Sequence, residues 1–90
     1  MAMDWQMSNE FDRIMRDGDW HLGKAESLEG SEYYSEAKSH YFEAMNYYRE
    51  ADILATRFDD CRRYDAIKKY ESCKRSVHEL VYKSCESKGR

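Results

Sequence analysis

Cysteine and histidine are the side chains best suited to chemistry in this 90-residue sequence, and their spacing limits what chemistry to expect. Cys61, Cys73 and Cys85 recur every 12 residues, and His78 falls between the last two. Structural zinc sites instead hold their ligands in pairs separated by about two to five residues. The pattern therefore predicts no metal site and no cofactor. An odd number of cysteines also gives no complete set of disulfides, so we expect free thiols and a cytoplasmic protein.

The histidines give no stronger indication of catalysis. His21, His40 and His78 are expected on separate helices or faces. The sequence contains no glycine-rich phosphate loop, no nucleophile elbow and no constellation of paired carboxylates. We therefore predict no catalytic residues and no enzyme activity. A small enzyme would require the fold to bring a cysteine, a histidine and a carboxylate into one pocket.

The charged residues are unevenly distributed, and the last third of the chain is basic. Residues 1–60 carry 14 acidic and 6 basic side chains, whereas residues 61–90 carry 4 acidic and 9 basic ones. The overall charge of −3 lacks the basic excess of a nucleic-acid-binding module, so no nucleic acid partner is expected. The basic residues form either a docking surface for an acidic peptide or a solvated face. The predicted partner-binding residues among them are Lys68, Lys69, Lys74 and Arg75, beside Arg62 and Arg63.

Large apolar residues outside the helical stripes are the second candidate for partner binding. Phe42 and Ile53 stand on one outer line of the predicted second helix, where a partner helix can lie. Trp20 falls outside the stripe of its own helix, and tryptophan is enriched in binding hot spots. Alternatively, residues 3–7 cover part of this surface. The predicted partner-binding residues of this kind are Trp20, Phe42 and Met45.

Three amphipathic segments must position these side chains. In each, apolar or small residues recur at steps of three and four, which keeps them on one face of a helix. The clearest stripe runs through Tyr34, Ala37, Tyr41, Ala44, Tyr48, Ala51, Ala55 and Phe58. It is preceded by Phe11, Met15, Gly18, Leu22, Ala25 and Leu28 and followed by Ala66, Tyr70, Cys73, Val77 and Leu80. This pattern in a chain without proline predicts an all-α antiparallel three-helix bundle.

The predicted helices cover roughly residues 8–29, 32–56 and 60–83. They form a single domain over residues 1–90, with an N-terminal extension at 1–7 and a frayed polar tail at 84–90. No apolar run approaches the ~20 residues that a membrane span needs, so no direct membrane insertion is expected.

Two turns separate the predicted helices. Gly30 suits the left-handed end of the first helix, and Ser31 suits the N-cap of the second. Between residues 57 and 62 the apolar stripe changes phase, and Asp59 and Asp60 offer N-cap oxygens. We therefore expect a turn there and a monomer. A continuous helix would instead favour pairing between chains as a coiled coil.

Part of this pattern resembles known helical families. Tyr34, Ala37, Tyr41 and Ala44 follow the alternation of aromatic residues and alanine in the second helix of a tetratricopeptide repeat, although no second repeat follows at the 34-residue period. Over residues 8–83 the chain more closely resembles the MIT (microtubule interacting and trafficking) domain. That domain is a three-helix bundle whose first two helices look like one such repeat.

The resemblance implies a function as well as a fold. MIT domains are not catalytic, and they bind short tail motifs of the membrane-remodelling ESCRT-III subunits in a groove between two helices, often the second and third. We therefore expect capture of a short protein motif at roughly micromolar affinity. The chain departs from the family at Gly18, where an alanine-like residue is usual, and in its eight tyrosines. The alternative is a small stand-alone regulator or inhibitor of the phage or effector type. It would clamp a larger protein through Trp20, Phe42 and the carboxylates around them.

Overall fold

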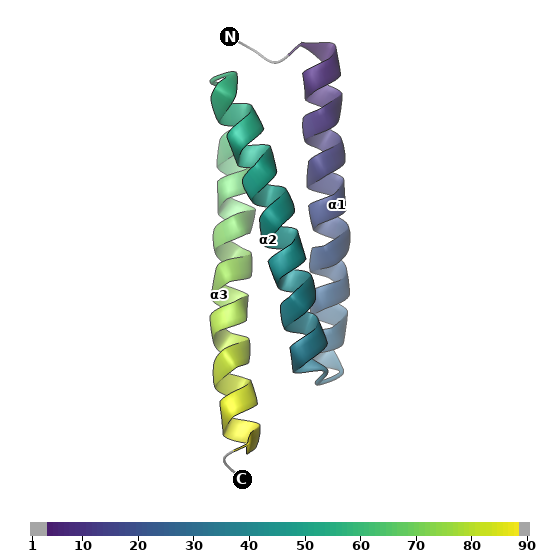
Figure 1. Cartoon of the computed structure of the whole chain (residues 1–90), viewed down its shortest axis with the longest axis vertical. Helices are drawn as coiled ribbons and strands as arrows, with labels where there is room; N and C mark the ends of the chain where they lie inside the picture. Colours follow the sequence, from purple (N-terminus) through teal and green to yellow (C-terminus); the bar gives the residue numbers. More distant parts are fainter. Residues whose placement is uncertain (1–3, 89–90) are drawn as a thin grey trace.

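The computed structural model describes the backbone of residues 4–88 and the side chains of residues 4–82. Helix α1 spans Trp5–Gly30, α2 spans Tyr34–Arg57 and α3 spans Arg63–Lys88. Successive helices run in opposite directions, as their short connections require (Figure 1). The predicted all-α antiparallel three-helix bundle is confirmed.

Both outer ends of the bundle are more helical than predicted. α1 begins early because the side chain of Asp4 accepts a hydrogen bond of 2.8 Å from the Met7 backbone N–H and so caps the helix. The first turn of α1 thus belongs to the segment expected as an N-terminal extension. At the other end, α3 continues to Lys88, through most of the expected frayed tail. The rest of these two segments, 1–3 and 89–90, lies outside the described residues.

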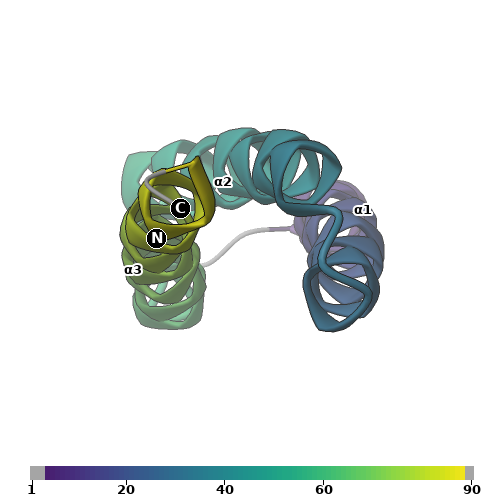
Figure 2. The ribbon, with the colours of Figure 1, turned by 90° about the horizontal axis from the view of Figure 1, so that it is seen from below.

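Helix α2 is central and contributes half of the buried residues among the side chains that the structure describes. It packs against α1 on one side and α3 on the other, and seen end-on the three helices form an arch with α2 at its crown (Figure 2). The predicted stripes face inward. The buried residues are Phe11, Gly18 and Ala25 of α1, Ala37, Tyr41, Ala44, Tyr48, Ala51 and Ala55 of α2, and Ala66, Cys73 and Leu80 of α3.

The largest fully buried side chain, Tyr48, fits in the core because the facing residue is Gly18. A Cβ atom at Gly18 would lie only 2.7 Å from Tyr48 Cε1, and a close-packed interior leaves little room to relieve such a contact. α1 continues through Gly18 without a break. The glycine that departs from the MIT-like pattern therefore makes space for one of the unusual tyrosines.

Both turns contain a left-handed residue that is not glycine, namely Glu32 with φ of 66° and Asp59 with φ of 52°. After α1, the backbone N–H of Tyr33 donates to the carbonyl of Leu28 at 2.9 Å. That hydrogen bond spans the end of the helix in the manner of a Schellman motif. The same arrangement recurs after α2, so each helix ends in this motif with an acidic residue at the position that glycine usually takes.

The predicted chemistry of the first turn is therefore wrong, although its location is right. Gly30 is the last residue of α1 and does not take the left-handed conformation, and Ser31 caps the end of α1 rather than the start of α2. The N-cap of α2 is Tyr33, without a side-chain hydrogen bond. The cause is the Schellman hydrogen bonds, which place the left-handed position two residues after Gly30.

The predicted turn between α2 and α3 is confirmed, and Asp60 forms side-chain hydrogen bonds within it. The side chain of Asp60 accepts a hydrogen bond of 2.9 Å from the backbone N–H of Arg62, just before α3 begins. Asp60 also holds the Arg62 guanidinium in an ion pair at 2.9 Å. Asp59 instead occupies the left-handed position that ends α2.

Candidate functional site

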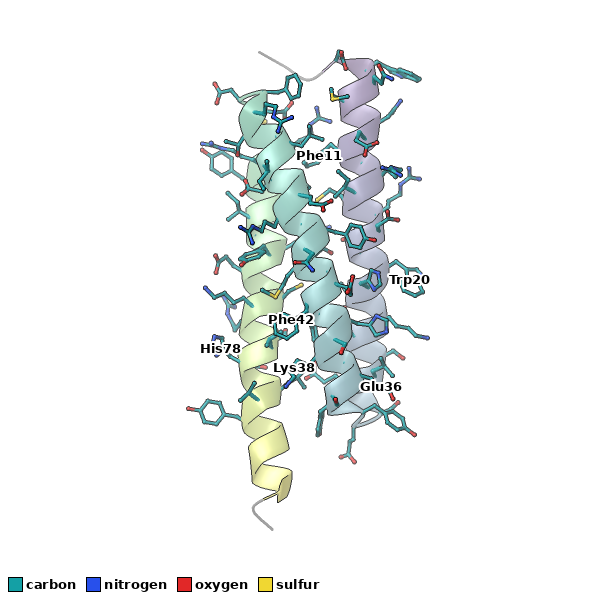
Figure 3. All side chains as sticks on the ribbon, in the orientation of Figure 1. Phe11, Trp20, Glu36, Lys38, Phe42 and His78 are labelled. Atoms are coloured by element: carbon teal, nitrogen blue, oxygen red, sulfur yellow. The ribbon has the colours of Figure 1, made fainter. Side chains whose placement is uncertain are left out.

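The outer surface between α2 and α3 is a groove lined by both helices. Residues at steps of three and four along each helix face this surface. Helical spacing from the residues of a hollow between the two helices assigns to this side Lys38, Phe42, Met45, Arg49 and Asp52 of α2 with Ile67, Tyr70, Glu71, Lys74 and Val81 of α3, and we call this surface the α2–α3 groove. This hollow of about 460 Å³ lies at one end and is lined by Arg49, Asp52, Ile67, Tyr70 and Glu71. Phe42 and Lys38 lie farther along the same surface (Figure 3).

The groove exposes a row of large apolar side chains. Phe42 is 48% exposed, Ile67 38% and Val81 44%. Beneath them, Met45 and Tyr70 are half-buried and pack against the core of Tyr41, Tyr48 and Leu80 and their neighbours. Several exposed apolar side chains on one side of a molecule are a feature of surfaces that bind other proteins.

The charges of the groove differ between its two ends. Lys38 and Lys74 give the end around Phe42 a positive charge, and neither lysine takes part in an ion pair among the described side chains. At the opposite end, around Ile67, Arg49 is accompanied by the acidic Asp52 and Glu71. The Phe42 end therefore combines an exposed aromatic ring with two lysines, which suits an apolar and acidic ligand.

The structure does not gather the predicted basic residues of α3 on one face. Lys74 lies in the α2–α3 groove, whereas Lys68 and Arg75 are exposed and, by helical spacing, lie opposite the buried stripe of α3. Lys69 points to the inner side of the arch, where its ammonium forms an ion pair of 2.9 Å with Asp19 of α1. A cluster of four basic side chains for one ligand is thus reduced to Lys74.

The predicted apolar candidates are exposed, but they lie on different sides of the molecule. Trp20 of α1 is 59% exposed and lies well away from Phe42, which is next to α3 (Figure 3). Ile53 is 50% exposed and, unlike Phe42, lines a hollow between α2 and α1, with Glu10 and Ile14 of α1. The N-terminal turn does not cover these residues, and Trp5 within it is itself 80% exposed. One partner therefore needs a large surface to contact both Trp20 and Phe42.

The inner side of the arch contains a polar cluster centred on Tyr48. The Tyr48 hydroxyl donates a hydrogen bond to Asp19 Oδ1, the oxygen that also accepts from Lys69 Nζ at 2.9 Å. Burial raises the pKa of Tyr48 well above its ordinary value, and the hydrogen bond to Asp19 raises it further. The cluster links all three helices. The Tyr48 hydroxyl within it stays protonated and serves as a hydrogen-bond donor.

Burial also raises the pKa of a second tyrosine, Tyr41, and of the buried Cys73. Tyr41 donates a hydrogen bond of 2.7 Å to Glu29 of α1, and burial raises the pKa of its hydroxyl. Burial likewise raises the pKa of the Cys73 thiol to about 11. A thiol that remains protonated at neutral pH is a poor nucleophile. These groups therefore stabilise the bundle as neutral, buried side chains.

Two histidines that the sequence analysis did not connect meet between α1 and α2. Nδ1 of His21 in α1 lies 3.0 Å from Nδ1 of His40 in α2, and the rings are stacked at 5.3 Å. Tyr47 stacks on the His21 ring at 5.5 Å, and the edge of Trp20 contacts it at 4.9 Å. The residues are 19 positions apart, so only a fixed α1–α2 register would have indicated the contact. The three histidines lie on separate helices as predicted, but His21 and His40 meet between α1 and α2, and His78 points outward from α3 (Figure 3).

Comparisons of this chain with protein families, with curated proteins and with solved structures find no match. Over the described residues, none of the three helices is both long enough and apolar enough to cross a lipid bilayer.

Proposed function

We propose that this chain is a non-catalytic protein-interaction domain that binds a short, acidic, amphipathic peptide in the α2–α3 groove. The observation that carries the proposal is the row of exposed apolar side chains, Phe42, Ile67 and Val81, beside the lysines Lys38 and Lys74. A monomer has no use for such a row inside its own fold, because the core below it is already closed by Met45, Tyr70 and their neighbours.

The shape and chemistry of the groove favour a helical ligand. Two antiparallel helices form a straight channel that accepts the apolar face of a third helix, with anchors at steps of three and four residues. Acidic residues of the ligand on the flank of that face would meet Lys38 and Lys74. These lysines are at the surface, so they contribute more to the rate of association and to specificity than to affinity.

The resemblance to the MIT domain supports a finer version of the proposal. In that family the ligand groove often lies between the second and third helices, the same pair that forms the groove here. The ligand would then be a tail motif of an ESCRT-III subunit, and the domain would recruit its protein to that assembly. Binding of about −8 kcal/mol, roughly micromolar, is the scale expected for such a motif.

An NMR titration of the isotope-labelled chain with ESCRT-III tail peptides tests the proposal. Saturable shifts are expected in the groove residues of α2 and α3. Phe42→Ala should weaken binding about tenfold, as the loss of an anchoring ring does, whereas Ile53→Ala, which removes an equally exposed apolar side chain from the hollow between α2 and α1, should leave it unchanged. Lys74→Ala should weaken binding mainly at low salt, and Lys68→Ala should not.

The outcomes separate the general proposal from the finer one. If ESCRT-III peptides cause no shifts at millimolar concentration while a designed acidic amphipathic helix binds in the groove, only the MIT-like recruitment fails. If neither peptide binds, or if binding is insensitive to Phe42→Ala, the α2–α3 groove is not the ligand site.

A second function is favoured by a separate observation, the exposure of Trp20 on α1. In this function the chain is a small regulator that clamps a larger protein through Trp20 and the acidic residues of α1. Its signature would be an interaction lost in Trp20→Ala and retained in Phe42→Ala. The reverse pattern would support the α2–α3 groove.

A further inference from the structure

We propose that His21 and His40 together form a binding site for a divalent transition-metal ion, with Zn²⁺, Ni²⁺ and Cu²⁺ as the chemical class. The site lies on the outer surface between α1 and α2, apart from the α2–α3 groove, and does not depend on the peptide-binding proposal. It also differs from the cysteine and His78 positions whose spacing predicted no metal site.

The separation of the two ring nitrogens fits a shared ion. Nδ1 of His21 and Nδ1 of His40 are 3.0 Å apart. Two nitrogens bound at 2.0–2.1 Å to one ion lie about 2.9 Å apart when the angle at the metal is a right angle and about 3.3 Å apart when it is tetrahedral. The observed distance falls between these values, so a ring rotation of both histidines can direct the two lone pairs to one ion with little movement of the helices.

The surroundings hold both rings near this position. His21 and His40 come from two helices that pack along their length, and both residues are half-buried. Tyr47 stacks on the His21 ring with the planes 15° apart, and the edge of Trp20 contacts both imidazoles. Ligands restrained in this way lose little freedom when the ion binds, which favours binding.

The ligand set defines which ions are expected. Within the part of the chain that the structure describes, no group of three or more His, Cys, Asp or Glu side chains is placed to hold a metal. The ion would therefore keep water in its remaining positions and exchange readily. Imidazole ligands select Zn²⁺, Ni²⁺ and Cu²⁺, with Cu²⁺ bound most tightly, over Mg²⁺ and Ca²⁺, which prefer oxygen ligands.

Metal binding would change the hydrogen bond that the pair makes without an ion. A hydrogen bond between the two rings requires one Nδ1 to carry a proton and the other to accept it. Both Nδ1 lone pairs must be free to bind the ion, so the proton of the donor ring moves to its Nε2. The ion then replaces the shared proton as the link between α1 and α2.

The test uses the untagged 90-residue chain with Cys61→Ser and Cys85→Ser, so that neither affinity tags nor these thiols compete for metal. Thermal unfolding is followed with increasing Ni²⁺ or Zn²⁺, and Mg²⁺ serves as the control ion. An ion that binds only the folded state should raise the midpoint by several degrees for each tenfold excess over its dissociation constant. Paramagnetic Ni²⁺ should also broaden the ring signals of His21 and His40 before those of His78.

Three matched variants locate the site. His21→Gln and His40→Gln should each remove the metal-dependent rise in the midpoint, whereas His78→Gln should keep it, since His78 lies on α3. Circular dichroism without metal establishes that each variant folds. The proposal is overturned if 1 mM Ni²⁺ and Zn²⁺ leave the midpoint of the parent chain unchanged, or if the rise persists in His21→Gln and His40→Gln.

Discussion

Helix α2 makes different kinds of side-chain contact with α1 and with α3. Toward α1 it pairs its polar and aromatic groups with partners, since Tyr48 donates to Asp19, Tyr41 donates to Glu29, and His40 meets His21. Toward α3 its inner residues are closely packed, but at the outer edge Phe42 remains exposed beside Lys38 and Lys74. The α1–α2 interface is thus built for internal stability, whereas the α2–α3 groove retains the apolar surface that a partner can use.

This contrast has a physical basis in the residues that face α2. α1 offers carboxylates and Gly18, which allow large phenol rings to be buried with their hydroxyls satisfied. α3 offers Ala66, Cys73 and Leu80, which close the core but supply no partner for the outer side chains of α2. The following experiments test the contrast, from the largest expected effect to the smallest.

The largest effect concerns the free energy needed to expose the buried side of α3 that packs against α2. In a chain with Cys61→Ser and Cys85→Ser, Cys73 should react with a thiol reagent at pH 8 only through unfolding of the whole domain, since it is fully buried and its pKa is raised to about 11. The opening free energy from labelling rates should match the global value, which is about 5 kcal/mol or more for such a domain. An opening free energy much lower than the global value would show that α3 detaches while α1 and α2 stay folded.

A glycine pair tests the close fit on the α1 side. Gly18→Ala should destabilise the domain by about 1–3 kcal/mol, because the added Cβ overlaps the Tyr48 ring and overpacking outweighs the gain in helix propensity. Gly23→Ala is the control, since nothing lies within 4 Å of its Cβ, and it should stabilise the domain by about 0.5–1 kcal/mol. Chemical denaturation measures both. Equal effects at the two positions would contradict the close fit of Tyr48.

Alkaline pH tests whether the buried phenols stabilise the α1–α2 interface as neutral groups. The pKa of Tyr48 is raised in the folded state, so above about pH 10 the unfolded chain releases a proton that the folded chain keeps. Stability is therefore complete below pH 10 and falls as pH rises, by up to about 1.4 kcal/mol per pH unit for this group. Tyr48→Phe should make the decrease between pH 9 and 11 less steep, whereas Tyr82→Phe, which removes an exposed hydroxyl, should not.

The smallest effect compares the two turns. Glu32 after α1 and Asp59 after α2 both occupy left-handed positions, which are strained for residues with a Cβ. Glu32→Gly and Asp59→Gly should each stabilise the domain, by about 0.5–1 kcal/mol, because glycine takes this conformation freely. Denaturant midpoints of the two variants measure the gain. Destabilisation by either substitution would mean that its carboxylate stabilises the turn more than the backbone strain opposes it.

Much of the fold was predictable because helical periodicity is a local property. Steps of three and four identified the buried stripes of all three helices, and the phase change near Asp59 located the second turn. Turn chemistry was less predictable, since glycine at position 30 suggested a left-handed end that the hydrogen bonds place at Glu32 instead. The start of α1 was missed because its cap, Asp4, precedes the apolar stripe.

The candidate site was predictable only in part. Phe42, Lys69 and Lys74 were all predicted as partner-binding residues, yet Lys69 forms an ion pair with Asp19 on the inner side of the arch. About half a turn of helix, roughly two residues, separates one side of a helix from the opposite side, so a basic segment in the sequence does not indicate a basic face. The groove itself depends on how α2 and α3 are aligned.

Sequence periodicity alone specified three helices, their inward faces and the positions of both turns, because each depends on neighbours within a few residues along the chain. The register between helices decided the rest: that Gly18 faces Tyr48, that His21 meets His40, and that Phe42 lies next to α3 while Trp20 lies elsewhere. The first two are contacts between residues 30 and 19 positions apart. Their geometry is set by side-chain packing between helices, which the spacing within one helix does not contain.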